Sequence, residues 1–262
     1  PIRTRIKSMA GDNSLKSFTV WVLVALTTGA SAVVMTTVWL TKYLGGFDWN
    51  NEKVFNYHPL FMVIGMVFLY ANSALVYRVF RNSRKPLLKS VHGILHILAL
   101  VFSIVGLVAV FKFHNLPTHN IPNMYSLHSW IGLAVVILFC MQWVIAFVAF
   151  VFPTLSDSLR ASYLSMHRFW GAGIFVGSVA SCLLGLTEKN FFAGNYAKLP
   201  DAAKLSNCLG LVLSAYAILI VYILAARISA AWSRPPRPSG WSFVKAETNR
   251  RRDNIGFIHF SY

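Results

Sequence analysis

Four histidines lie near the starts of four separate hydrophobic stretches of the chain: His58, His92, His128 and His167. Successive members are 34, 36 and 39 residues apart, so each belongs to a different stretch. Imidazole at the end of an apolar membrane helix is uncommon and usually functional. Because neutral imidazole is a common ligand of haem iron, the spacing predicts two haems stacked across one bilayer, each held by two histidines.

The composition is that of a membrane protein. Of 262 residues, 56% are hydrophobic and 12% are charged, about half of the roughly 25% charged residues of a soluble domain. The net charge of +16 would suit nucleic acid, but most basic residues flank apolar stretches, so we expect no nucleic-acid partner. The three cysteines lie inside apolar segments without zinc-type spacing, and we expect no disulfide framework.

The elements that position the histidines are predicted to be membrane helices. Each apolar stretch reaches the length of about 20 residues that a bilayer-spanning helix needs, and glycine, proline and asparagine separate the stretches. The predicted fold class is all-α, a six-transmembrane-helix bundle whose helices 2–5 form a four-helix haem-binding core. The predicted helices cover residues 17–41, 57–79, 90–112, 127–152, 164–187 and 205–231.

The domain organisation follows from these spans. Residues 17–236 are predicted to form one six-helix domain, and no cleavable signal peptide is expected before its first span. Residues 1–16 form an N-terminal tail, in which 1–8 precede a plausible initiator at Met9 and are interpreted as either upstream translation or the edge of a fragment. Residues 237–262 form a C-terminal tail whose composition predicts disorder.

Lysine and arginine indicate the orientation. They are concentrated in both tails and in the loops after the second and fourth helices, whereas the remaining loops are nearly balanced in charge. By the positive-inside rule, both termini are expected to be cytosolic. The basic C-terminal tail is interpreted as part of this topology signal in preference to a site for anionic lipid.

Orientation determines which histidines can share an iron. His58 and His128 begin helices that run inward from the non-cytosolic face, whereas His92 and His167 begin helices that run outward from the cytosol. A bond from one iron to both His58 and His92 would have to bridge most of a hydrocarbon core of about 30 Å. The predicted pairs are therefore His58–His128 and His92–His167, and two axial histidines favour electron transfer over oxygen binding.

Two alternatives apply to these histidines. They could form hydrogen bonds inside the bundle, as in a haem-free transporter that couples transport to protons, or the chain could be a scaffold without turnover. The matching of depth in two pairs favours haem over both. His96 lies one turn after His92 on the same face and has no partner at its depth, so we expect it at a haem edge or in the core.

Five motifs resemble the cytochrome b-561 family of ascorbate-dependent transmembrane di-haem reductases. The resemblance runs from about residue 18 to about residue 236 and is nearer to the animal vesicle-type and duodenal-type members than to the plant ones. The motifs are FNYHP at 55–59, ALVYR at 74–78, KSVHG at 89–93, NMYSLHSW at 123–130 and GLTEK at 185–189.

The resemblance implies a function. Cytosolic ascorbate would give electrons to two haems b, which pass them to a non-cytosolic acceptor, either monodehydroascorbate or a ferric chelate. The protein would then be a transmembrane oxidoreductase in the membrane of a vesicle, an endosome or lysosome, or the cell surface. The resemblance also allows a homodimer.

Basic residues are expected to form the cytosolic ascorbate site. Lys85, Lys89 and His92 are spaced to share one helix face, and Arg160 lies seven residues before His167. Ascorbate is a monoanion at neutral pH, and the resemblance implies that Lys85, Lys89 and Arg160 bind it; topology alone is the alternative explanation of these charges.

Further residues are expected to contact the haems. Arg78 lies 20 residues after His58, about 30 Å along a helix, where it could pair with a haem propionate. By the resemblance, the loop before His128 covers the outer haem and receives the acceptor. The expected haem contacts are Arg78, Lys85, Asn123, Met124, Tyr125, Ser126 and Glu188, and the expected acceptor site is Phe113, His114, Asn115 and Tyr125.

The chain departs from the family pattern at two places. Ser233 precedes Arg234-Pro235 where related proteins often have lysine, which puts a contact of the C-terminal tail with haem or ascorbate in doubt. Tyr70-Ala71 stands where a Gln-Gly pair is common, so we expect the packing of the second span to differ locally.

Overall fold

The computed structural model of the chain describes residues 2–118 and 121–225, and side chains from residue 16 onward. Every regular element in this part of the chain is helical, and six helical spans are long and apolar enough to cross a membrane. The predicted all-α, six-span architecture is thereby confirmed. The described residues from Phe18 onward belong to one compact unit.

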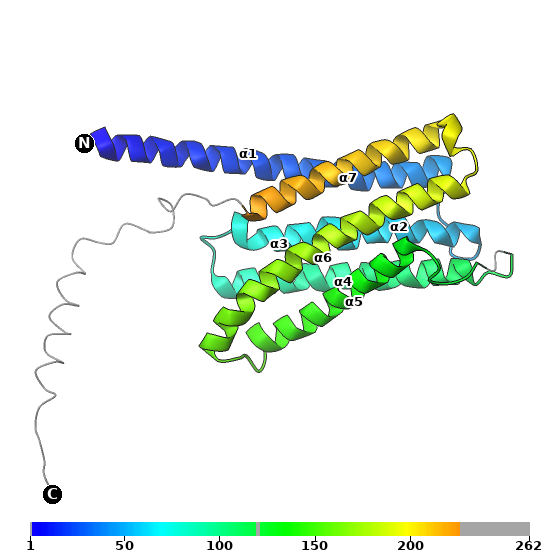
Figure 1. Ribbon diagram of the computed structural model, residues 1–262. Coiled ribbons are helices and arrows are strands. Elements are labelled where there is room, and N and C mark those ends of the chain that lie inside the picture. Colours follow the sequence, from blue (N-terminus) through cyan, green and yellow to red (C-terminus); the bar gives the residue numbers. More distant parts are fainter. Residues whose placement is uncertain (1, 119–120, 226–262) are drawn as a thin grey trace, which may run out of the picture. The chain divides into compact units, whose positions relative to one another are not determined.

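The elements follow one another with short connections (Figure 1). Span one is α1 with a π-helical end, η1, and span two is built from four consecutive pieces that include the π-helical segment η3. The elements are α1 (Ile2–Val38), η1 (Trp39–Tyr43), η2 (Glu52–Asn56), α2 (Tyr57–Met62), η3 (Val63–Leu69), α3 (Tyr70–Val79), α4 (Lys85–His114), α5 (Leu127–Phe150), α6 (Asp157–Phe192), η4 (Tyr196–Lys198) and α7 (Asp201–Ala225).

Several helices begin earlier or end later than their apolar stretches predict. Helix α1 begins at Ile2 instead of residue 17, α4 at Lys85 instead of residue 90, and α6 at Asp157 instead of residue 164. Polar turns at a membrane interface can remain helical because water satisfies the backbone groups at a helix end. The length of an apolar stretch, by contrast, indicates only the part of the helix inside the hydrocarbon core. The expected last turns of the sixth span, 226–231, and the C-terminal tail lie outside the described residues.

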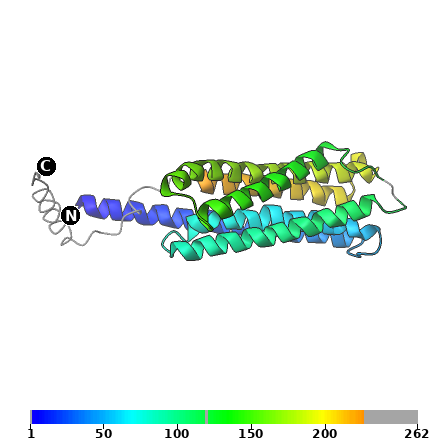
Figure 2. The same ribbon diagram turned by 90° about the horizontal axis from the view of Figure 1, so that it is seen from below.

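The four helices that carry the histidines lie together. Helix α5 packs along α6, and α4 packs along span two. Figure 2 shows α5, α6 and α7 along one side of this unit and α4 with span two along the other. Helix α7 flanks α6 and touches span one, where the Trp21 and Tyr222 rings meet edge to face with centroids 5.5 Å apart.

Small residues allow the helices to approach closely, as is usual in membrane bundles. A Cβ atom on Gly65, inside the π-helical segment η3, would lie 2.9 Å from the carbonyl oxygen of Ala99 on α4. Large apolar side chains also point outward; Leu211 is 73% exposed and Ile218 is 70% exposed. In a bilayer these faces contact lipid, so the buried core is confined to the interior between the helices.

Candidate functional site

His58 and His128, called the outer pair because the sequence predicts them on the non-cytosolic side, meet between α2 and α5. The ring centroids of His58 and His128 are 5.9 Å apart, and the ring planes are inclined by 85°. Two metal–imidazole bonds of about 2 Å each, with the half-widths of two imidazole rings, add to roughly 6 Å between centroids. The separation therefore leaves space for one iron atom between the two rings.

His92 and His167, called the inner pair because the sequence predicts them on the cytosolic side, meet between α4 and α6. The ring centroids of His92 and His167 are 6.1 Å apart, with the planes inclined by 67°. The structure brings together the same two pairs that depth matching predicts, each with a separation that suits one shared metal.

Hydrogen bonds at the far nitrogen orient three of the four rings. Backbone carbonyl oxygens lie 3.1 Å, 2.9 Å and 2.8 Å from the Nδ1 atoms of His58, His92 and His128. A carbonyl can only accept, so each Nδ1 donates and each Nε2 keeps its lone pair for a metal, the usual arrangement of metal-binding histidine. The acceptors belong to Gly106, Ser73 and Ser181. This donor set fits haem iron. For His167, no partner of Nδ1 is recorded among the described residues.

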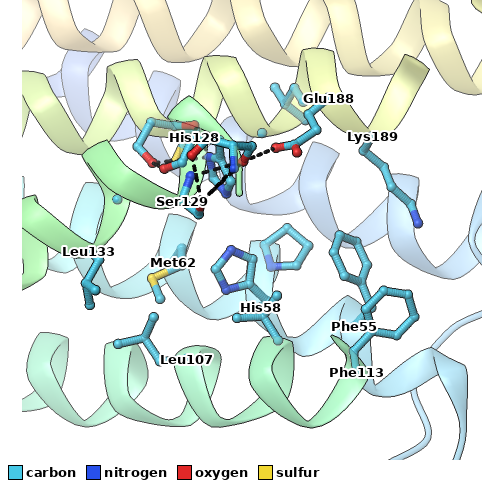
Figure 3. A pocket seen from close by; sticks show the side chains of 18 of the residues that line it. Phe55, His58, Met62, Leu107, Phe113, His128, Ser129, Leu133, Glu188 and Lys189 are labelled. Atoms are coloured by element: carbon cyan, nitrogen blue, oxygen red, sulfur yellow. Dashed lines mark hydrogen bonds between the residues drawn. The ribbon is translucent and has the colours of Figure 1, made fainter. Parts of the chain in front are cut away.

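A cavity of about 360 Å³ surrounds the outer pair (Figure 3). Its wall is mostly apolar and includes Met62 and Leu107 beside the two imidazoles. At Gly185 the wall has no room for a side chain, because an added Cβ would lie 2.7 Å from Cε1 of His128. Glycine at this position of α6 therefore lets the His128 ring lie flat against the helix.

The loop before α5 covers this cavity. Asn123, Met124, Tyr125 and Ser126 all line it, as expected for haem contacts. Met124 adopts a left-handed backbone conformation with φ of 59°, and the indole N–H of Trp130 donates to its carbonyl oxygen at 2.7 Å. This bond fixes the strained turn over the outer pair.

Helix α5 begins directly after this loop with a capping box. The Ser126 hydroxyl accepts from the backbone N–H of Ser129, and the Ser129 hydroxyl accepts from the backbone N–H of Ser126. Reciprocal caps of this kind satisfy two otherwise unpaired donors at a helix start. The cap therefore fixes the first turn of α5, which carries His128.

Of the four residues expected at the acceptor site, three line the cavity and one does not. Phe113, His114 and Tyr125 line the wall, and the ring centroids of His114 and Tyr125 are 6.5 Å apart. Asn115 does not line it. Its Oδ1 atom accepts from Nδ2 of Asn123 at 3.2 Å, so Asn115 stabilises the loop through Asn123 without lining the cavity.

Glu188 is anchored to the same loop. The Ser126 hydroxyl donates to Glu188 Oε2 at 3.2 Å, and the same carboxylate lies near enough to the Tyr125 phenol to affect its pKa. Loss of hydration and, after it, the neighbouring carboxylate raise the pKa of Tyr125 above its ordinary value. The bond from Ser126 to Glu188 holds the loop to the end of α6.

On the opposite side of the bundle, the expected ascorbate residues differ in their surroundings. The Lys89 ammonium donates to the carbonyl oxygen of Phe150 at 2.7 Å, and the Phe150 ring lies against His167 with centroids 5.7 Å apart. Arg160 forms an ion pair with Asp157, a partner that the sequence reasoning missed. Lys85 is exposed at the start of α4, and no contact with the inner pair is recorded for it among the described residues.

Arg78 reaches the end of α7. Its Nη2 atom donates to the carbonyl oxygen of Leu224 at 2.6 Å, which satisfies a carbonyl in the last described turn of that helix. This bond ties span two to α7. A role for Arg78 toward a haem propionate stays a prediction.

Aromatic side chains fill the interior beside the inner pair. The His96 ring contacts His92 and Tyr70, with centroids 4.6 Å and 4.8 Å away. The Tyr70 hydroxyl donates to the carbonyl oxygen of Gly171 at 3.0 Å, one helical turn after His167. Tyr70 thus packs on His96, which itself contacts His92, and bonds one turn from His167; these contacts explain how a large residue is accommodated where the related pattern has glutamine.

The comparison with known proteins identifies the family. A sequence model described as eukaryotic cytochrome b561 matches residues 57–193, the segment that holds all four histidines and the loop over the cavity. This chain belongs to the cytochrome b561 family. The predicted membership is confirmed.

Curated relatives support the same assignment. The chain is 46% identical to the transmembrane ascorbate-dependent reductase CYB561 of Homo sapiens over 209 residues, which are 79% of this chain and 81% of the relative. It is 47% identical to the Ovis aries reductase of the same name, with the same coverage. It is 39% identical to the lysosomal membrane ascorbate-dependent ferrireductase CYB561A3 of Bos taurus over 222 residues, 82% of each chain.

Sequence reasoning missed the groups that orient the imidazoles in this cytochrome b561. Ser73 and Ser181 contribute hydroxyls near the His92 and His128 rings, and both serines and Gly106 contribute their carbonyls. The only signal in the sequence is a small residue within an apolar helix, which also marks ordinary close packing. Their role becomes visible only when the neighbouring helix is placed.

Proposed function

We propose that this protein carries electrons across its membrane from cytosolic ascorbate, through two haems b, to monodehydroascorbate or a ferric chelate on the far side. The general class of its activity follows from family membership and the names of its relatives: the chain is an integral-membrane, ascorbate-dependent oxidoreductase. The number of haems, the acceptor and the direction of transfer belong to the proposal.

One observation carries the proposal, the presence of two separate histidine pairs with metal-compatible spacing, one pair between α2 and α5 and the other between α4 and α6. The bound haems supply one-electron redox chemistry. The protein holds the imidazoles in position through the backbone carbonyls of Gly106, Ser73 and Ser181, and surrounds them with apolar side chains that exclude water.

The charge distribution supports the direction. Basic residues in both tails and in the loops after spans two and four favour a cytosolic position for the inner pair. Ascorbate, a monoanion, would bind near Lys89 and Arg160, give up one electron and release one proton to the cytosol. The same electron would leave from the outer cavity, where it would reduce monodehydroascorbate to ascorbate with uptake of one proton from the far side, or Fe(III) to Fe(II).

Haem analysis of purified protein tests the central claim. Pyridine haemochrome measurement is expected to give about two haems b per chain, because each histidine pair fills both axial positions of one iron. Ascorbate is expected to reduce both. Well-folded protein that binds no haem would overturn the proposal and leave the proton-coupled transporter, and one haem per chain would remove the two-step relay.

Lys89→Gln is expected to slow reduction of the inner haem at sub-saturating ascorbate by about fivefold, because an exposed charge pair contributes up to about 1 kcal/mol. The apparent KM for ascorbate should rise while the haem spectrum stays unchanged. Arg84→Gln, which removes another exposed cation directly before α4, is the matched control and should stay within about twofold of the unmodified protein. Equal effects of the two substitutions would show that Lys89 contributes only to topology.

A further inference from the structure

Two adjacent charged side chains near the end of α6 point in different directions. Figure 3 shows Glu188 turned toward the His128 side of the outer cavity and Lys189 turned toward Phe55 and Phe113. The carboxylate of Glu188 accepts a hydrogen bond from the hydroxyl of Ser126. Glu188 is therefore not the ion-pair partner of Lys189.

The Lys189 ammonium rests on aromatic rings. Its Nζ atom lies 4.2 Å from the ring centroid of Phe55 and 5.9 Å from that of Phe113. Lys189 is half-buried, and the structure records no hydrogen bond or ion pair between this ammonium and any described residue. Glu52 attracts it only as a more distant charge.

The face of an aromatic ring attracts a cation. It is a weaker hydrogen-bond acceptor than an anion, so the three N–H donors of the ammonium are better satisfied by an anion. A partly buried charge without a partner is unfavourable, so such a group favours binding of an opposite charge. Among the described residues that line the cavity, Lys189 is the only lysine or arginine. Any anion that enters the cavity meets its one fixed positive charge there.

We propose that Lys189 is the anion-binding residue of the outer cavity, where its ammonium contacts a carboxylate or enolate group. This assignment rests on the proposed function. Two sources share that chemistry: an anionic electron acceptor that docks above the outer haem, and a propionate of that haem. The helix end alone would also favour a cation at this position, so the test must separate anion binding from a structural effect.

The test uses the haem-loaded protein in sealed vesicles that contain ascorbate, with an impermeant acceptor added outside. Ferric–EDTA serves as the anionic acceptor and hexaammineruthenium(III) as the cationic one; each takes one electron. Lys189→Gln is compared with Lys189→Arg, which keeps the charge, and with Lys198→Gln, which removes an exposed lysine that does not line the cavity. The midpoint potential of the outer haem is measured separately by spectroelectrochemistry.

If the anion is the acceptor, Lys189→Gln should lower the rate with ferric–EDTA about tenfold at low ionic strength, the effect of one lost interaction of roughly 1.4 kcal/mol. Added salt should shrink the difference. The rate with hexaammineruthenium(III) should be unchanged or higher, Lys189→Arg should restore reduction of ferric–EDTA, and Lys198→Gln should behave like the unmodified protein.

If the anion is a propionate, Lys189→Gln should instead lower the midpoint potential of the outer haem, because a nearby positive charge favours the reduced state. Both acceptors would then be affected alike. If Lys189→Gln matches Lys198→Gln in both rates and in the midpoint potential, the assignment is overturned. Unmodified protein that reduces neither acceptor would instead reject the proposed function, which distinguishes the two failures.

Discussion

His128→Ala is expected to remove the outer haem and to abolish electron delivery from ascorbate to an impermeant ferric chelate on the far side of sealed vesicles. The substitution removes one of the two histidines proposed to hold the outer haem and leaves the inner pair, 6.1 Å between centroids, intact. The inner haem should therefore still be bound and still be reduced by cytosolic ascorbate, whereas delivery should fall to the rate of vesicles without protein.

His92→Ala is the complementary variant. It should remove the inner haem, so that ascorbate on the cytosolic side no longer reduces the protein efficiently, while the outer haem stays reducible by a chemical reductant added from its own side. Haem content should fall by half in each variant. If both variants lost uptake and delivery equally while each kept one haem, the two irons would not act in series, and the directional mechanism would have to be abandoned.

The pairing behind this prediction could be obtained from the sequence because it depends only on topology. Apolar length fixes the number of spans, and basic loops fix their direction. The position of each histidine within its span then gives its depth. Contacts to a single neighbour cannot be obtained in this way, since they depend on how the helices rotate and approach. The bond from Lys89 to the Phe150 carbonyl and the ion pair of Arg160 with Asp157 belong to this second class.

Segments of irregular helix were unpredictable for a related reason. The π-helical segment Val63–Leu69 has the apolar composition of an ordinary membrane helix. What distinguishes it is the close approach of Gly65 to the backbone of α4, and π-helical turns frequently occur near functional sites. The segment lies between His58 and Ser73, whose hydroxyl and carbonyl contact His92. The wider turn of the π-helical segment therefore affects how His58, in the outer pair, is placed relative to Ser73, which contacts the inner pair.

Small residues serve two purposes in this bundle. Where two helices approach closely, the backbone of one comes within hydrogen-bonding distance of a side chain on the other. Gly106 shows this directly: a Cβ on it would lie 3.5 Å from the His58 carbonyl, and its own carbonyl accepts from the His58 ring. Close packing and orientation of the metal ligand therefore have the same structural cause, and enlarging a small residue near a histidine should disturb both.

Gly185→Ala is expected to cause loss of the outer haem, although it adds only one methyl group. The new Cβ would lie 2.7 Å from Cε1 and 3.0 Å from Nδ1 of His128, closer than real carbon atoms approach. Because Cβ is fixed to the backbone of α6 and α6 packs along α5, the imidazole must turn. Turning breaks the bond from Nδ1 to the Ser181 carbonyl and moves Nε2 away from His58.

Gly173→Ala on the same helix is the matched control, since nothing lies within 4 Å of a Cβ at that position. It should keep both haems and, by helix propensity, stabilise α6 by up to about 1 kcal/mol. Haem content and thermal unfolding in detergent, measured on both variants, separate the two cases. Gly185→Ala protein that retained two haems with an unchanged spectrum would mean that the His128 ring is not held against α6, and the geometry of the outer pair described above would be incorrect.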